Sequence, residues 1–179
     1  DDSVDCGNSS MLNIKDDLTI EVNIKPSDLS GEQVILSKGS AKMPYKLYLS
    51  GNKLVFSFED TEGEEEYSLS SDSVAITQDK LHRIAAVRRK KEEKKGSNSS
   101  DITKMLDSFS STASKFELEL YIDGEKVKSK VLEKSIGVAD NEAPMIIGNN
   151  FKGIIGEVRL WGTALPEDWI NKALSEVSN

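Results

Sequence analysis

The sequence predicts an all-β protein, an antiparallel two-sheet β-sandwich of the jelly-roll kind, that ends in a short C-terminal helix. Apolar and polar residues alternate along most of the chain, as in LTIEVNIKP at 18–26, which is the pattern of strands with one buried face. Turn sequences such as SGNK, DTEG and IDGE separate these runs. Many short strands with regular turns between them are typical of sandwiches and jelly rolls.

The predicted strands follow one another with the same period of two. They occupy residues 18–26, 33–37, 45–49, 54–58, 66–69, 82–88, 116–122, 145–147 and 156–161. Pro26 ends the first strand because it has no backbone N–H to donate. Asp123 and Gly124 are expected to form a hairpin turn, since both tolerate the positive φ that such turns require.

Large apolar residues at alternate positions supply the expected core. In LVFSF and FELELYI, every second residue can help to fill a layer about 10 Å thick between two facing sheets. In the last strand, Val158 and Leu160 should face this core. Glu157, Arg159 and Trp161 should then point outward.

Only two stretches have helical spacing. LPEDWINKALSEV begins with Leu165 and Pro166, and its early acidic residues suit a first helical turn. The apolar face of this closing helix is expected to comprise Trp169, Ile170, Ala173, Leu174 and Val177. The second stretch, DITKMLDSF at 101–109, is expected to form one or two turns packed on the sandwich.

Composition excludes several classes of protein. The chain has 179 residues, which suits one domain with its own core. One Cys and one His exclude an internal disulfide framework, a multi-thiolate zinc site and a His-rich metal centre. The formal net charge of −8 argues against nucleic-acid binding. No run approaches the roughly 18 apolar residues needed to cross a bilayer, so no membrane insertion is expected.

A long polar insertion interrupts the strand pattern at 89–115. Its 27 residues far exceed the length of a usual hairpin loop, about two to five residues. It continues a basic run, RRKKEEKK at 88–95, whereas EDTEGEEE at 59–66 is acidic. Both runs are interpreted as solvated loops and hairpin tips. The alternatives are attraction between the two runs, or docking of an anionic partner on the insertion.

Several segments, taken in order, resemble one family of domains. They are VDCGNSSMLNIKDDLTIEVNIKP, VILSKG, YKLYLSGNKLVFSF, LHRIAAVRR, LELYIDGEKV and IIGNNFKGIIGEVRLWGTALPEDWI. These segments are similar to the successive strands and the closing turn of laminin G-like domains, which belong to the concanavalin A-like lectin and glucanase superfamily. The resemblance implies a single domain of this type over residues 1–179, with the insertion at about 89–115.

Catalysis is not expected. Enzymes of that superfamily hydrolyse glycans with paired carboxylates on one strand, and Glu117 and Glu119 have a suitable spacing. The glucanase pattern E-x-D-x-x-E is absent, however, because its last acidic position falls on Ile122. The two glutamates are therefore interpreted as solvent-facing strand residues, and no catalytic residue is assigned.

Calcium is a possible cofactor that the resemblance implies. Many relatives hold calcium near the rim of a sheet, and this cation needs about six to eight oxygen ligands. The available oxygens in suitable loops belong to Asp1, Asp2, Asp5, Asp140 and Asn141. Numerous relatives begin the final strand with Ile-Asp-Glu, but this chain has Gly156 in place of the Asp. The metal ligands are therefore left unassigned.

A sugar site on one face or rim of the sandwich is the predicted functional site. Sugar recognition uses aromatic rings for stacking, polar groups for hydroxyls, and Arg for charged sugars. The outward strand residues of these types are Asn23, Tyr48, Arg83, Tyr121, Arg159 and Trp161. Each aromatic has an alternative role as a half-exposed strand residue. Sialic-acid-binding modules, which the chain resembles in layout, carry a Glu and an Arg near LVFSFED, but no Arg follows Glu59.

The sequence is interpreted as a non-catalytic recognition module of a secreted or cell-surface protein that binds a glycan or glycoprotein. The alternative is an adhesion or assembly domain that binds another protein through the 88–115 insertion and has no sugar site. His82, at the start of a strand, is expected to be structural. Cys6 is either a small buried residue or half of a bridge to another domain.

Overall fold

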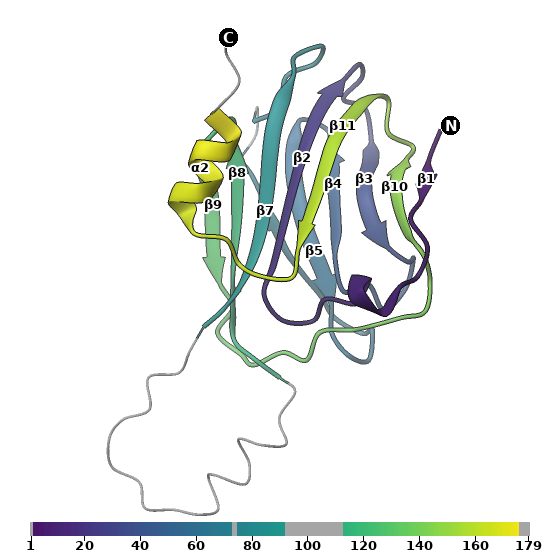
Figure 1. Ribbon diagram of the computed structural model, residues 1–179, viewed down its shortest axis with the longest axis vertical. Helices are drawn as coiled ribbons and strands as arrows, with labels where there is room; N and C mark the ends of the chain where they lie inside the picture. The colour runs from purple at the N-terminus through teal and green to yellow at the C-terminus, as the bar shows by residue number, and fades with distance from the viewer. Residues whose placement is uncertain (1, 73–74, 92–112, 176–179) are drawn as a thin grey trace, which may run out of the picture.

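The computed structural model describes residues 2–72, 75–91 and 113–175, which form a sandwich of two antiparallel sheets with a short C-terminal helix (Figure 1). Sheet A has the strand order β1 (Val4–Asp5), β10 (Met145–Asn149), β3 (Glu32–Lys38), β4 (Lys46–Ser50), β5 (Lys53–Glu59) and β6 (Glu66–Ser70). Sheet B has the order β11 (Gly153–Trp161), β2 (Leu18–Pro26), β7 (His82–Lys90), β8 (Phe116–Ile122) and β9 (Glu125–Val131). A 3₁₀ turn, η1 (Ser10–Leu12), precedes β2, and the helix is α2 (Glu167–Ser175). Every predicted strand overlaps an observed one, which confirms the predicted fold class.

The core lies between the two sheets. Phe56 and Phe58 of sheet A and Phe116 of sheet B are buried in it. The rings of Phe58 and Phe116 meet edge to face, with their centroids 5.9 Å apart. Burying a side chain of this size contributes about 1.5–3 kcal/mol to stability. The alternate large apolar residues seen in the sequence therefore join the two sheets.

Arg88 closes one end of this core. Its guanidinium donates to the carbonyl of Asp16 at 2.9 Å, to that of Pro44 at 2.6 Å and to that of Ile14 at 2.7 Å. It also lies over the Phe58 ring, 5.0 Å from the centroid. A buried charge is tolerated only when its donors are satisfied. Because Ile14 and Asp16 lead into sheet B and Pro44 leads into sheet A, Arg88 ties both sheets together.

The hairpin between β8 and β9 turns at Asp123 and Gly124, which have the predicted positive φ, 52° and 90°. The Asp123 carboxylate accepts from the backbone N–H of Arg83 at 2.9 Å and lies 2.9 Å from Nδ1 of the buried His82. His82 Nε2 accepts from the N–H of Thr77 at 3.0 Å. The ring proton must therefore lie on Nδ1 and point at Asp123. These contacts give His82 a structural role.

Strand β7 runs two residues further than predicted and brings part of the basic run into sheet B. Lys90 pairs with the first residue of β8, and its ammonium binds Asp16 at 3.0 Å. Lys91 binds Glu117 of β8 at 2.5 Å. Within the described ranges, both lysines thus contact adjacent segments and not the acidic run at 59–66. Residues 92–112, including the second predicted helix, lie outside the described residues.

Helix α2 lies against the outer face of sheet B, over β7 and β8 (Figure 1). Pro166 precedes it, and its carbonyl accepts from the N–H of Trp169 and of Ile170. Glu167 and Asp168 occupy the first turn, where carboxylates stabilise the positive end of the helix dipole. A helix of nine residues is marginal on its own, so α2 depends on its contact with the sheet.

The packed face of α2 differs from the predicted face at Trp169. Ile170 and Leu174 are buried against outward residues of β7 and β8. Trp169 remains 67% exposed, because it projects beside this contact and not into it. Val177 lies outside the described residues. In the part of the chain that the structure describes, no helix is long and apolar enough to span a membrane.

Substitution of Arg88 tests its part in closing the sandwich. Arg88→Met should lower the free energy of unfolding by about 3 kcal/mol, because buried carbonyls lose their donors. Chemical denaturation measures this change. The control is Lys130→Met, an exposed residue of β9, which should change stability by less than about 0.5 kcal/mol. Equal stability of Arg88→Met and the unmodified protein would contradict this role.

Candidate functional site

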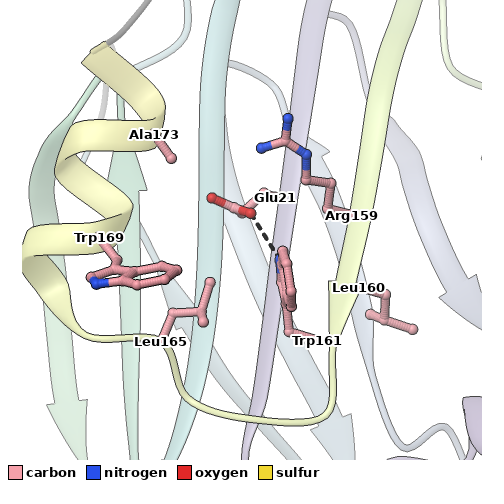
Figure 2. A pocket seen from close by; sticks show the side chains of 7 residues that line it. All are labelled: Glu21, Arg159, Leu160, Trp161, Leu165, Trp169 and Ala173. Atoms are coloured by element: carbon pink, nitrogen blue, oxygen red, sulfur yellow. Dashed lines mark hydrogen bonds between the residues drawn. The ribbon is translucent and has the colours of Figure 1, made fainter.

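A groove lies between β11 and α2 on the outer face of sheet B (Figure 2). It consists of two adjoining cavities of about 530 and 240 Å³ that share Glu21, Arg159 and Ala173. The larger cavity is completed by Leu160, Trp161, Leu165 and Trp169. The smaller one is completed by Val22, Asn23, Arg83, Glu157 and Leu174. Together these residues define what we name the α2 groove.

The larger cavity is the aromatic end of the α2 groove. Trp161 of β11 and Trp169 of α2 stand on opposite sides of it, with Leu165 between them (Figure 2). Trp161 is 40% exposed, and its Nε1 donates to Glu21 Oε2 at 2.9 Å, which fixes the orientation of the indole. Aromatic side chains bind apolar ring faces by stacking. This end of the groove therefore suits a ligand with flat apolar surfaces.

The smaller cavity is the polar end. Arg159 donates from Nε and Nη2 to one oxygen of Glu157, at 3.0 and 2.8 Å. Arg83 donates to the carbonyl of Leu174 in α2 at 3.3 Å. Asn23 pairs with Arg83 across β2 and β7 and lines the same cavity. Amide, guanidinium and carboxylate groups thus gather at this end of the α2 groove.

An irregularity in β11 shapes this polar end. The pairing of β11 with β2 shifts register between Ile155 and Val158, and such bulges redirect nearby side chains. Gly156 lies within this shift, directly against Asn23. A Cβ at position 156 would lie 3.3 Å from the Asn23 Cβ. The small residue at this position therefore leaves room for Asn23.

A buried polar network holds α2 beside the groove. Arg89 of β7 donates to the carbonyl of Ala164 at 3.2 Å and to that of Leu165 at 2.9 Å. Its Nε also donates to Glu119 at 3.1 Å, and the Tyr121 hydroxyl donates to the same carboxylate at 2.5 Å. The segment leading into α2 is thus bonded to the sheet through Arg89. The position of the wall that carries Trp169 depends on this network.

The carboxylates of β8 are paired with cations. Glu119 is buried, not solvent-facing as the sequence indicates, because α2 covers this part of the sheet. Burial raises the pKa of Glu119, but hydrogen bonds from Arg89 and Tyr121 outweigh burial and hold this pKa below its usual range. Glu117 binds Lys91. Because the general acid of glycan hydrolysis needs a raised pKa, Glu119 is not suited to that role.

Asn23, Arg83, Arg159 and Trp161, which the sequence predicts as ligand-binding residues, come together in the α2 groove. They lie on β2, β7 and β11, which are adjacent in sheet B. Alternation along each strand places them all on the outer face. The structure thus gathers at one site residues that are widely separated in the sequence.

Tyr48 lies elsewhere, on β4 of sheet A. The Lys46 ammonium is 4.3 Å from the centroid of its ring and occupies one face of it. Burial, followed by the charges of Glu66 and Glu32, raises the pKa of Tyr48 to about 12. Glu59, which the sequence compares with a glutamate of sialic-acid-binding modules, lies in the same sheet at the end of β5. Its carboxylate accepts from the backbone N–H of Met43 at 3.2 Å. Tyr48 therefore contributes nothing to the α2 groove.

The expectation that Tyr121 is accessible is wrong. It points outward from the sandwich, as the period of two predicts, but Ile170 and Leu174 of α2 cover it completely. Burial, together with the bond to Glu119, raises the pKa of Tyr121 far above its usual range. Tyr121 supports α2 and does not face the groove.

Trp169, Leu165 and Glu21 are groove residues that the sequence did not reveal. Helical spacing assigns Trp169 to the packed face, and Glu21 is one of several polar residues of β2. One sequence feature could have indicated the pair: Trp161 ends β11 and Trp169 lies in the first turn of α2, so only a short connection separates them. Their meeting depends on where α2 docks, which periodicity does not specify.

Two of the residues expected to bind calcium, Asp140 and Asn141, contact lysines. Asp140 binds Lys15 at 2.9 Å. The buried Lys38 ammonium donates to the carbonyl and Oδ1 of Asn141, at 3.2 and 3.1 Å, and to the carbonyl of Ala143. Among the described residues, no group of three or more His, Cys, Asp or Glu side chains could hold a metal. An ammonium thus already contacts the side-chain oxygens of Asp140 and Asn141.

Comparison with known proteins identifies the fold. No protein-family model and no curated protein sequence matches the chain. The structure is similar to the CBM40 domain of the Ruminococcus gnavus IT-sialidase bound to alpha2,3 sialyllactose, with a TM-score of 0.66, 14% identity, and 97% of this chain and 96% of that chain covered. It is also similar to the receptor binding domain of botulinum neurotoxin C/D mosaic serotype, with a TM-score of 0.64, 16% identity, and 96% and 39% covered. The chain thus spans about two fifths of that toxin chain, and these likenesses show a shared β-sandwich fold.

Glu119→Gln tests the network beneath α2. At neutral pH it should lower the free energy of unfolding by about 2 kcal/mol, because Arg89 loses its charged partner. The pKa of Glu119 is lower in the folded protein than its ordinary 4.5, so its stabilisation is present above about pH 4.5 and is lost as the pH falls through the folded pKa. The deficit of the variant should therefore shrink in acid.

Unfolding free energies of the variant and the unmodified protein, measured in steps from about pH 7 to pH 2, follow this change. The matched control is Glu133→Gln, an exposed residue after β9, which should stay close to the unmodified protein at each pH. If the loss of unfolding free energy in Glu119→Gln stays constant or grows in acid, the charge of Glu119 does not stabilise this network.

Proposed function

We propose that this domain is a non-catalytic recognition module that binds a glycan in the α2 groove. The observation that carries the proposal is the arrangement of Trp161 and Trp169 on opposite sides of a cavity that continues into a polar cavity. Sugars have apolar ring faces and hydroxylated edges, so they match a groove with one aromatic end and one polar end. The volume of the larger cavity, about 530 Å³, falls in the range of ligand sites.

The polar end offers the bonds that sugar hydroxyls need. A hydroxyl both donates and accepts, so it can bind a carboxylate and a guanidinium at the same time. Glu157 and Arg159 present this pair, already joined to each other. The amide of Asn23, which also donates and accepts, lines the same cavity.

Similar folds support a glycan as the class of ligand. The CBM40 domain that shares this fold is bound to sialyllactose. Its identity to this chain is 14%, so the ligand carries over only as a proposal. We also propose that residues 1–179 form a single laminin G-like domain. We propose that this domain is secreted or lies at the cell surface.

A recognition role is preferred over hydrolysis and over docking through the insertion. Glu119, the better buried of the β8 carboxylates, has a lowered pKa and two hydrogen-bonding partners, whereas hydrolysis needs a proton donor. Lys90 and Lys91, at the start of the insertion, form ion pairs within the domain. If the insertion binds another protein, it would therefore have to do so through residues other than Lys90 and Lys91.

A glycan array probed with the purified domain tests the proposal. The domain should bind a subset of glycans, and Trp161→Ala and Trp169→Ala should each weaken that binding by roughly tenfold or more, because each removes a stacking surface. Leu81→Ala is the matched control, since Leu81 is an exposed apolar residue outside the groove. Thermal unfolding of each variant separates lost binding from lost structure.

Two results would contradict the proposal. One is an array without any bound glycan, combined with partner binding that disappears on deletion of residues 92–112, which would favour the protein-binding alternative. The other is glycan binding that survives both tryptophan substitutions, which would place the sugar outside the α2 groove.

Calcium should have no effect on the loop at 140–141, since Lys38 and Lys15 already satisfy its oxygens. We propose that the melting temperature is the same with excess calcium and with a chelator, because only a ligand of the native state raises it. Differential scanning calorimetry measures this. A rise of several degrees with calcium would contradict the proposal and restore the calcium expectation.

A further inference from the structure

The charges that line the α2 groove cancel. Glu21 and Glu157 are acidic and Arg83 and Arg159 are basic, and no other charged residue lines either cavity within the described ranges. Glu21 is only 6% exposed and accepts from Trp161 Nε1, so its charge sits against the aromatic end. The groove therefore offers a ligand no excess positive charge.

The cations of the groove are also already engaged. Arg159 directs two donor nitrogens at Glu157, and Arg83 donates to the last turn of α2. An acidic sugar would have to replace Glu157 as the partner of Arg159. It would also bring its carboxylate toward the buried Glu21, where reduced contact with water strengthens repulsion between like charges.

A neutral sugar avoids both costs. Its hydroxyls can donate to Glu157 or Glu21 and accept from Arg159 or Asn23 without breaking the existing ion pair. Its ring can stack on the indoles without adding charge. We infer that the α2 groove selects neutral sugars over acidic sugars. This inference rests on the proposed function and specifies the ligand class.

An array of matched glycan pairs tests the inference. Each pair consists of a neutral glycan and its acidic counterpart, such as lactose and α2,3-sialyllactose, at one low ionic strength so that charge effects are not screened. The neutral member of each bound pair should bind roughly threefold to tenfold more tightly, the size expected for a few partly exposed charges. Titration calorimetry of the bound pairs gives the ratio of dissociation constants.

Two charge-changing variants show whether the groove sets this ratio. Glu157→Gln removes a negative charge and releases Arg159, so the ratio should move toward the acidic member. Arg159→Gln removes a positive charge, so the ratio should move further toward the neutral member. Glu133→Gln, which lines neither cavity, makes the same change of net charge as Glu157→Gln and should leave the ratio unchanged.

The outcomes separate this inference from the proposed function. Acidic members that bind as tightly as neutral ones or more tightly, with binding still lost in Trp161→Ala, would overturn neutral selection and leave the glycan site in place. Shifts of the same sign in Glu157→Gln and Arg159→Gln would also overturn it. An array with no bound member of any pair would overturn the proposed function and this inference together.

Discussion

Two consecutive arginines of β7 hold this structure together from opposite faces of one sheet. Arg88 points between the sheets and binds carbonyls that lead into both of them. Arg89 points outward and binds the carbonyls of Ala164 and Leu165, just before α2, while Glu119 fixes its guanidinium. Because alternate strand residues face opposite sides, neighbours in sequence serve the core and the helix separately. The groove needs both, since sheet B is one wall and α2 is the other.

The candidate site is a product of this docking more than of any one motif. Trp161 belongs to the last strand and Trp169 to the helix, and only the position of α2 makes them opposite walls of one cavity. The sandwich itself is shared with structures at 14–16% identity, so the fold does not specify a ligand. In the function proposed here, the ligand is specified by an aromatic end joined to a polar end, where the charges of Glu157 and Arg159 are balanced.

The sequence predicted the architecture because burial of one strand face leaves a period of two that can be read directly. The same period identified Asn23, Arg83, Arg159 and Trp161 as outward residues, and the structure brings these four together in the α2 groove. The prediction failed where a second layer covers the outer face: Tyr121 is outward on its strand but lies under α2. Periodicity shows which way a residue points from its strand or helix, but it does not show what packs on that face. For the same reason the sequence did not predict that Trp169 and Trp161 would line one cavity.

The chain's tryptophans allow the most direct test of the central claim, because it has two and both line the α2 groove. In the nitrogen-15-labelled protein, each indole gives one Nε1–H signal in a two-dimensional NMR spectrum. Binding in the α2 groove predicts that a glycan selected by the array shifts both indole signals in a saturable titration, with the dissociation constant found by calorimetry. A glycan that binds with that constant while both indole signals stay in place would contradict the groove as the recognition site.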